Sequence, residues 1–340
     1  MQVGRRYSLF QTLNWGRKYI LWFLLFDSIV ISLYYFTQWS WMAIPWQPIS
    51  LIGIAVAFYL GFKNNSSYER LWEARKIWGG IVNDSRSFTV YTRDFINNDD
   101  AQTPQSEKQL QHLRKQVVQR HIAWLYALTY QLRVVKDWEH KSDFEQELRT
   151  YLGTQTSPDS YKKLANYLSQ QEYDYIMSKD NKASHLLSLQ SKALMNLRKE
   201  GIIEHFRHLE IQNHIRSFYE LQGKSERIKN FPFPRQYATV NYFFVLLFII
   251  LLPFGMLDVF NTEIWRAYIW VAIPFSVVGS WVFWMMEMIG DYSENPFEGL
   301  YNDVPITNIS SSIERDILQM LDETDLPEVT KPITEFQLLV

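Results

Sequence analysis

The distribution of apolar residues along this chain restricts its fold more than any other feature. Residues 19–36, 240–257 and 267–286 carry almost no charged side chains, and each stretch approaches the roughly 20 residues that cross about 30 Å of hydrocarbon. A fourth stretch, residues 51–62, is equally apolar but shorter, and it can cross a bilayer where neighbouring helices shield it from lipid. The chain is therefore expected to form a bundle of four transmembrane segments.

Basic residues at the ends of these stretches predict the orientation of the chain, because cytoplasmic loops carry an excess of Lys and Arg. Basic residues precede the first stretch and follow the short one, at Arg5, Arg6, Arg17 and Lys18 and at Lys63, Arg70, Arg75, Lys76 and Arg86. The connection at residues 37–47 carries no charge, and that at 258–266 carries one basic residue. We therefore expect a multi-pass protein of the cell membrane, with both termini and residues 63–235 in the cytoplasm.

The region between the membrane segments is charged and has the period of helices. In residues 109–138 the apolar side chains recur every three to five positions, which is typical of an amphipathic helix. Residues 183–199 and 202–221 predict two more helices that meet near Gly201. No stretch is typical of a β-strand, so the fold class is all-α. The expected regions are N-terminal membrane segments in 1–62, a helical cytoplasmic domain in 63–235, C-terminal membrane segments in 236–290, and a cytoplasmic segment with an extended tail in 291–340.

Composition argues against several classes of function. The formal net charge is −2, so nothing indicates a nucleic-acid partner. The sequence contains no cysteine, which rules out disulfides and thiolate metal sites. It also has no glycine-rich phosphate loop and no nucleophile elbow. We therefore expect no catalytic residues and no cofactor, and we do not expect an enzyme.

The short apolar stretch carries a regular row of bulky side chains. Ile54, Phe58 and Phe62 fall at i, i+4 and i+8, so a helix places them on one face. Gly53, Ala55, Ala57 and Gly61 lie between them and allow neighbouring helices to approach closely. Such a row suits the hydrophobic constriction of a pore. It is also the pattern of an ordinary core stripe, and periodicity alone leaves both interpretations open.

Ionisable residues offer few candidate sites. Glu204, His205 and His208 share one predicted helix, but a metal site needs three or four converging ligands, which one helix rarely supplies. We expect a solvated helix face there and no metal. Asp27 lies inside an apolar stretch, where it is expected to face the protein interior and to hydrogen-bond to a neighbouring helix. Lys63 directly follows Phe62, and it either favours anions at the inner mouth of a pore or is a paired or snorkelling lysine.

Several motifs are similar to those of the bestrophin family, specifically its prokaryotic bestrophin-like channels. The most specific block contains Leu60-Gly61-Phe62, residues 68–79 (YERLWEARKIWG) and Asn83-Asp84-Ser85-Arg86. Three weaker matches are residues 226–230 (ERIKN) with Pro232-Phe233-Pro234, then Leu252-Pro253-Phe254-Gly255, and residues 294–299 (ENPFEG). Together they cover most of residues 51–305 in the order of the family.

This resemblance implies a homopentamer in the membrane lipid, with one ion pathway along its symmetry axis. Ile54, Phe58 and Phe62 would form its narrow neck. The family has a second, apolar constriction in its cytoplasmic part, which we place at Leu186 with Leu187 close behind. The permeating ion is either chloride or another anion, or a monovalent cation. Animal members bind calcium through a run of acids, but residues 298–303 here contain two acids, so calcium activation is not expected.

Two other functional classes remain open at the level of sequence. The chain could be a membrane-anchored signalling or scaffold protein whose helical domain binds a partner. It could also be a membrane metalloenzyme that uses Glu204, His205 and His208. A monomeric state in detergent would favour the first, and bound metal would favour the second.

Overall fold

The computed structural model describes residues 6–101, 103–329 and 339, and in this part of the chain every regular element is a helix. The all-α prediction is thereby confirmed for the described residues. The elements are α1 (Leu9–Thr37), η1 (Ser40–Met42), α2 (Trp46–Phe95), α3 (Glu107–Arg133), α4 (Asp143–Tyr151), η2 (Pro158–Asn166), α5 (Gln170–Met177), α6 (Lys182–Lys199), α7 (His205–Asn230), α8 (Arg235–Phe260), η3 (Arg266–Val271), α9 (Ala272–Asp291) and α10 (Ile306–Gln319). The chain divides into two compact units: unit 1 consists mainly of Leu71–Phe231 and Asn295–Val340, and unit 2 of Gly4–Arg70 and Pro232–Glu294.

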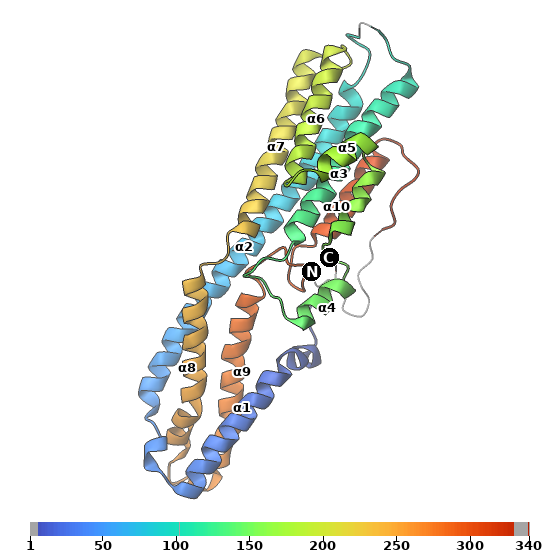
Figure 1. Cartoon of the computed structure of the whole chain (residues 1–340). Coiled ribbons are helices and arrows are strands. Elements are labelled where there is room, and N and C mark those ends of the chain that lie inside the picture. Colours follow the sequence, from blue (N-terminus) through green and yellow to red (C-terminus); the bar gives the residue numbers. More distant parts are fainter. Residues whose placement is uncertain (1–5, 102, 330–338, 340) are drawn as a thin grey trace. The chain divides into compact units, whose positions relative to one another are not determined.

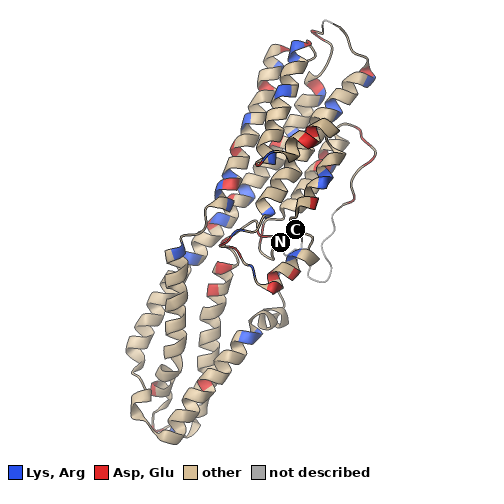
Figure 2. Cartoon of the chain, viewed as in Figure 1, with Lys and Arg blue, Asp and Glu red and all other residues tan. Residues whose placement is uncertain are grey.

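Unit 2 contains the apolar helices of the chain. In it, α9 packs against both α1 and α8 (Figure 1). Close approach depends on small residues, since a Cβ on Gly53 of α2 would meet the Phe248 ring of α8 at 2.6 Å. Among the described residues, four helical segments are long and apolar enough to cross a membrane, namely Leu9–Thr37, Ser40–Phe95, Arg235–Phe260 and Arg266–Asp291. Figure 2 shows few charged residues on α1, α8 and α9, which supports a membrane location for this unit.

The second apolar segment is the first part of a much longer helix. Residues 51–62 lie within α2, a single helix of 50 residues. No proline occurs between Pro48 and Pro104, so no residue of this stretch removes a backbone donor from the helix. The first part of α2 belongs to unit 2, and the rest belongs to unit 1.

Unit 1 is built around α3, whose central turns are buried and which packs against α6, α7 and α10. Its first turn is fixed by a capping box, in which Ser106 and Gln109 each accept a hydrogen bond from the other's backbone N–H. The expected pair of helices around Gly201 is confirmed as α6 and α7, and Gly201 has a φ of +76° that favours glycine. The predicted tail, residues 322–340, begins after α10, but residues 330–338 and 340 lie outside the described part of the chain.

Candidate functional site

The predicted neck residues lie on an exposed face of α2. Ile54, Phe58 and Phe62 are 68%, 67% and 57% exposed, respectively. Val56 and Leu60, on the other side of the helix, are buried in the core of unit 2. One face of α2 therefore packs inside the subunit, while the opposite face presents a row of bulky apolar side chains.

The exposed row is apolar along its whole length. The Phe58 and Phe62 rings meet edge to face, with centroids 4.6 Å apart. Leu51 extends the row by one further turn and is also exposed. No charged residue occurs between Trp46 and Phe62. Water does not solvate such a row well, and an exposed apolar row of this kind marks a surface that contacts lipid or protein.

Lys63 follows the row directly but points into the subunit. Its side chain is buried in an ion pair with Glu287 of α9, and Glu287 also accepts a hydrogen bond from the Asn241 amide of α8. Of the two roles considered for Lys63, the structure shows the paired lysine. Its charge is neutralised within the subunit and is not presented beside Phe62.

The exposed face continues with polar side chains that the sequence reasoning did not single out. Asn65 and Glu69 are both exposed, and the Asn65 amide donates to Glu69 Oε1 at 3.1 Å. Their spacing from Phe58 and Phe62 keeps them on the same side of α2. Glu69 is therefore the first charged side chain on this face after the apolar row. Its position seven residues after Phe62 is the sequence signal that places it on this face.

Leu186, the residue expected to form the second constriction, is a core residue of unit 1. It is 1% exposed and belongs to the apolar cluster that also contains residues of α3 and α7. Leu187 is buried in the same way. Identical buried side chains from several copies cannot meet, so this burial does not favour Leu186. Phe206, in the first turn of α7, is instead 74% exposed.

The candidate metal ligands Glu204, His205 and His208 do not converge. The Glu204 carboxylate caps α7 by accepting hydrogen bonds from the backbone N–H groups of Phe206 and Arg207. His208 is buried, whereas His205 is exposed. Within residues 6–101, 103–329 and 339, no three His, Cys, Asp or Glu side chains come close enough together to hold a metal ion.

The two acids of residues 298–303 are occupied by donors of unit 1. Glu298 Oε2 lies 2.8 Å from His140 Nδ1 and 3.4 Å from Arg149 Nη2. The Asp303 carboxylate accepts hydrogen bonds from the backbone N–H groups of Gly299 and Leu300. Burial raises the pKa of the Glu298 carboxyl, while His140 lowers it. A calcium ion, which takes six to eight oxygens, would have to displace these donors.

Comparisons with known proteins give the same family that the motifs indicated. The model of the family described as Bacterial/Fungal Bestrophin protein matches residues 17–319. The voltage-dependent anion channel-forming protein YneE of Salmonella typhi is 28% identical over 321 residues, which cover 94% of this chain and 91% of that protein. A voltage-dependent anion channel-forming protein of Ralstonia nicotianae is 26% identical over 332 residues, covering 92% and 94%.

The fold agrees with this result. A crystal structure of a bacterial bestrophin homolog from Klebsiella pneumoniae matches with a TM-score of 0.73 and 23% identity, covering 89% of this chain and 97% of that one. The family model spans most of the chain, and the helical architecture is shared. The protein belongs to the bestrophin family.

Proposed function

We propose that this chain is the subunit of an ion channel in which several copies surround a common pore. The observation that carries the proposal is the exposed row formed by Ile54, Phe58 and Phe62, on the side of α2 that does not pack within the subunit. A closed ring of copies would remove this row from water. The family resemblance suggests five copies, and the names of the curated relatives describe anion channels.

The apolar row supplies a mechanism for passive conduction. A narrow ring of Phe58 and Phe62 side chains excludes water and hence ions, and the ring conducts when the side chains splay apart. Each aromatic ring has a partly positive edge and a partly negative face, so ring rotation also changes the potential that a passing ion meets. No covalent chemistry and no cofactor is needed for this function.

Anions are the first candidate for the permeating ion, from the names of the relatives. A monovalent cation is the second candidate, and it has a specific structural reason. Glu69 is exposed and Lys63 is internally paired, so a symmetric assembly would carry a ring of carboxylates next to its apolar neck. Rings of Asp or Glu favour cations.

Phe206 fits a second constriction better than Leu186 does. A constriction made by equivalent side chains requires an apolar residue that is exposed on the single chain. Phe206 meets this requirement, whereas Leu186 is committed to the core of unit 1. We therefore place the second constriction at Phe206.

The membrane topology remains part of the proposal. We place the membrane segments in residues 1–62 and 236–290 and assign them to the cell membrane. Both termini and residues 63–235 would then lie in the cytoplasm. Exposed apolar side chains on α1, such as Leu21, Trp22 and Ile29, would then contact lipid. This orientation follows from the positive-inside rule.

The proposal is tested by measuring the reversal potential of the purified protein in a planar bilayer under a salt gradient. Currents that increase when Phe58→Ala widens the neck would support the channel. Glu69→Gln would shift the reversal potential toward anions if the carboxylate ring selects cations, and would leave it unchanged if the pore already selects anions. A monomeric particle that gives no current would instead favour the membrane-anchored scaffold.

A further inference from the structure

A group of buried polar side chains lies inside unit 2, away from the exposed face of α2. Asp27 of α1 and Ser276 and Ser280 of α9 are all fully buried. Neither carboxylate oxygen of Asp27 has a hydrogen-bond partner among the described residues, and neither do the two serine hydroxyls. Buried polar atoms are nearly always hydrogen-bonded, so four unpaired atoms in one place require an explanation.

The packing of α1 against α9 brings these three side chains together. Tyr19 and Phe23 of α1 both contact the Trp284 ring, with centroid distances of 4.8 and 6.3 Å. Trp15 contacts Tyr292, which directly follows the last residue of α9, so the two helices run antiparallel. Asp27 lies one turn beyond Phe23 and therefore faces the turns of α9 that precede Trp284, which hold Ser280 and Ser276. The Asp27 carboxyl lies beside the Ser276 hydroxyl, outside the geometry of a full hydrogen bond.

No charged side chain of the described residues pairs with Asp27, although α8, α9 and η3 all pack against α1. On α1 itself, Arg17 and Lys18 are more than two helical turns away in sequence. On the packed elements, each charged group either has another partner or lies toward a helix end. Glu287 pairs with Lys63, Asp258 accepts from the Trp46 N–H, Arg266 donates to Gln38, Arg235 pairs with Glu294, and Asp291 is the last residue of α9.

The hydrogen-bond donors and acceptors of these three side chains indicate that the site lacks one proton. An ionised carboxylate without a partner is too costly to bury in an apolar interior, and such a group is neutralised instead. A protonated carboxyl has one O–H donor, and each serine hydroxyl can both donate and accept. One added proton therefore lets Asp27 donate to Ser276 and accept from a serine hydroxyl. A divalent metal ion fits less well, because Ca²⁺ takes six to eight oxygens and the three side chains offer fewer.

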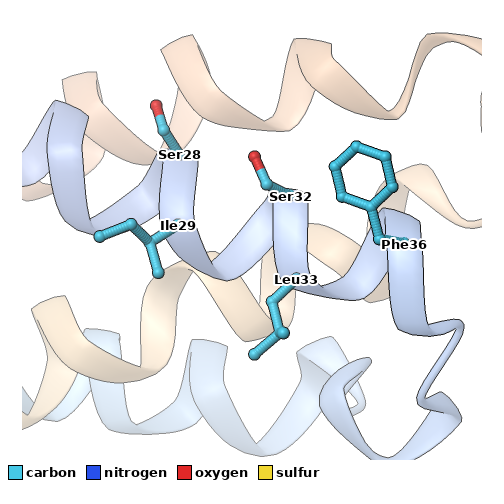
Figure 3. A pocket seen from close by; sticks show the side chains of 5 residues that line it. All are labelled: Ser28, Ile29, Ser32, Leu33 and Phe36. Carbon is cyan, nitrogen blue, oxygen red and sulfur yellow. The ribbon is translucent and has the colours of Figure 1, made fainter.

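We propose that Asp27, Ser276 and Ser280 form an intramembrane proton-binding site within each subunit, and that the bound proton joins α1 to α9. The site lies inside one subunit and does not depend on a pore. Ser28 and Ser32, by contrast, line a separate hollow of about 420 Å³ on α1 together with Ile29, Leu33 and Phe36 (Figure 3). Ser28 is therefore the matched control, because it is adjacent to Asp27 in sequence but lines this hollow.

The site is tested by infrared spectroscopy of the full chain in liposomes at neutral pH, with aspartate labelled by carbon-13. We expect a carbonyl stretch of a protonated carboxylic acid that shifts with the label and in D₂O, and that disappears in Asp27→Asn. Ser276→Ala should move this band because the acid loses a hydrogen-bond partner, whereas Ser28→Ala should leave it in place. If Asp27→Asn fails to fold, the labelled band of the wild-type protein decides the question.

Two results would overturn the proposal. The first is a wild-type spectrum in which labelled aspartate gives only carboxylate bands at neutral pH. The second is an acid band that appears only when sodium is removed, since this would assign the site to a sodium ion.

The pH dependence of unfolding gives a second measurement. Above about pH 4 an unfolded aspartate has lost its proton, so the folded state would hold one more proton than the unfolded state. Asp27 should then make the ratio of folded to unfolded protein fall by up to tenfold for each unit of rising pH, and unfolding of Asp27→Asn should depend less steeply on pH by this amount. The same pH dependence in both proteins would contradict the proposed site.

Discussion

At the scale of single residues, exposure separates side chains that the sequence pattern treats alike. Ile54 and Leu186 are both aliphatic residues at helical spacing, but the first is 68% exposed and the second 1%. Hydrophobic periodicity identifies the apolar face of a helix without indicating what covers that face. For this reason the sequence could predict the row at Ile54, Phe58 and Phe62, whereas the placement at Leu186 is not favoured by the structure.

Alanine variants of Phe206 and Leu186 allow the effects of an exposed and a buried apolar side chain on conductance and stability to be compared. Phe206→Ala should change conductance while leaving the free energy of unfolding nearly unchanged, because an exposed side chain loses few contacts. Leu186→Ala should cost about 2–5 kcal/mol of stability through the cavity it leaves in unit 1. Bilayer recordings and denaturant unfolding of both variants check this. A stable Leu186→Ala protein with altered conductance, beside an unaffected Phe206→Ala, would restore the original placement.

His121 provides a pH-dependent residue within unit 1. Burial lowers the pKa of His121 to about 3, and its ring contacts Phe88, Trp124 and Phe218. Ser85 donates its only hydroxyl proton to the Ile81 carbonyl, so His121 Nε2 must be the donor to Ser85 Oγ. The folded state thus holds neutral His121, whereas the unfolded state takes up a proton below its ordinary pKa of about 6.5.

Its contribution to stability is therefore complete above pH ~6.5 and is lost as the pH falls toward 3, at up to about 1.4 kcal/mol per pH unit. His121→Gln should show a shallower loss of stability on acidification than the wild-type protein. Acid titrations followed by near-UV circular dichroism would measure the difference. Parallel curves for the two proteins would show that His121 is not held neutral by its surroundings.

At the scale of elements, the sequence predicted most helices but not which side chains pair between them. The helices around Gly201 follow from their apolar period and a glycine that ends α6. The apolar half and the charged half of α2 suggest different environments, yet both belong to one helix of 50 residues. The partner of Lys63 is 224 residues away in sequence, so no local pattern could reveal the ion pair.

The buried pair between α2 and α9 should hold the neck segment of α2 in place. Lys63→Met leaves Glu287 buried without its cation, which should cost roughly 3–5 kcal/mol. The double variant Lys63→Met/Glu287→Met replaces both charges with apolar groups and should recover most of that loss. Unfolding in mixed detergent measures both variants. If the double variant is as unstable as Lys63→Met, the loss of stability does not come from the unpaired charge of Glu287.

At the scale of the whole molecule, the family and the membrane character are established from sequence and fold together, while the assembly is proposed. The motifs between residues 51 and 305 indicated the bestrophin family, and the family model that matches residues 17–319 agrees with them. The number of copies and the sign of the permeating ion depend on contacts that a single chain does not contain. The sequence of one subunit also has no pattern that indicates how many subunits assemble.

The central claim is that the exposed row of α2 lines a shared pore, and the absence of cysteine from the sequence allows a direct measurement. We would record bilayer currents of Phe58→Cys before and after addition of a water-soluble, charged thiol reagent, with Ile29→Cys on α1 as the control. Both positions are exposed on the single chain. The account predicts that modification blocks or strongly reduces the Phe58→Cys current and leaves the Ile29→Cys current unchanged. Phe58→Cys currents that do not respond to a reagent shown to have reacted would contradict it.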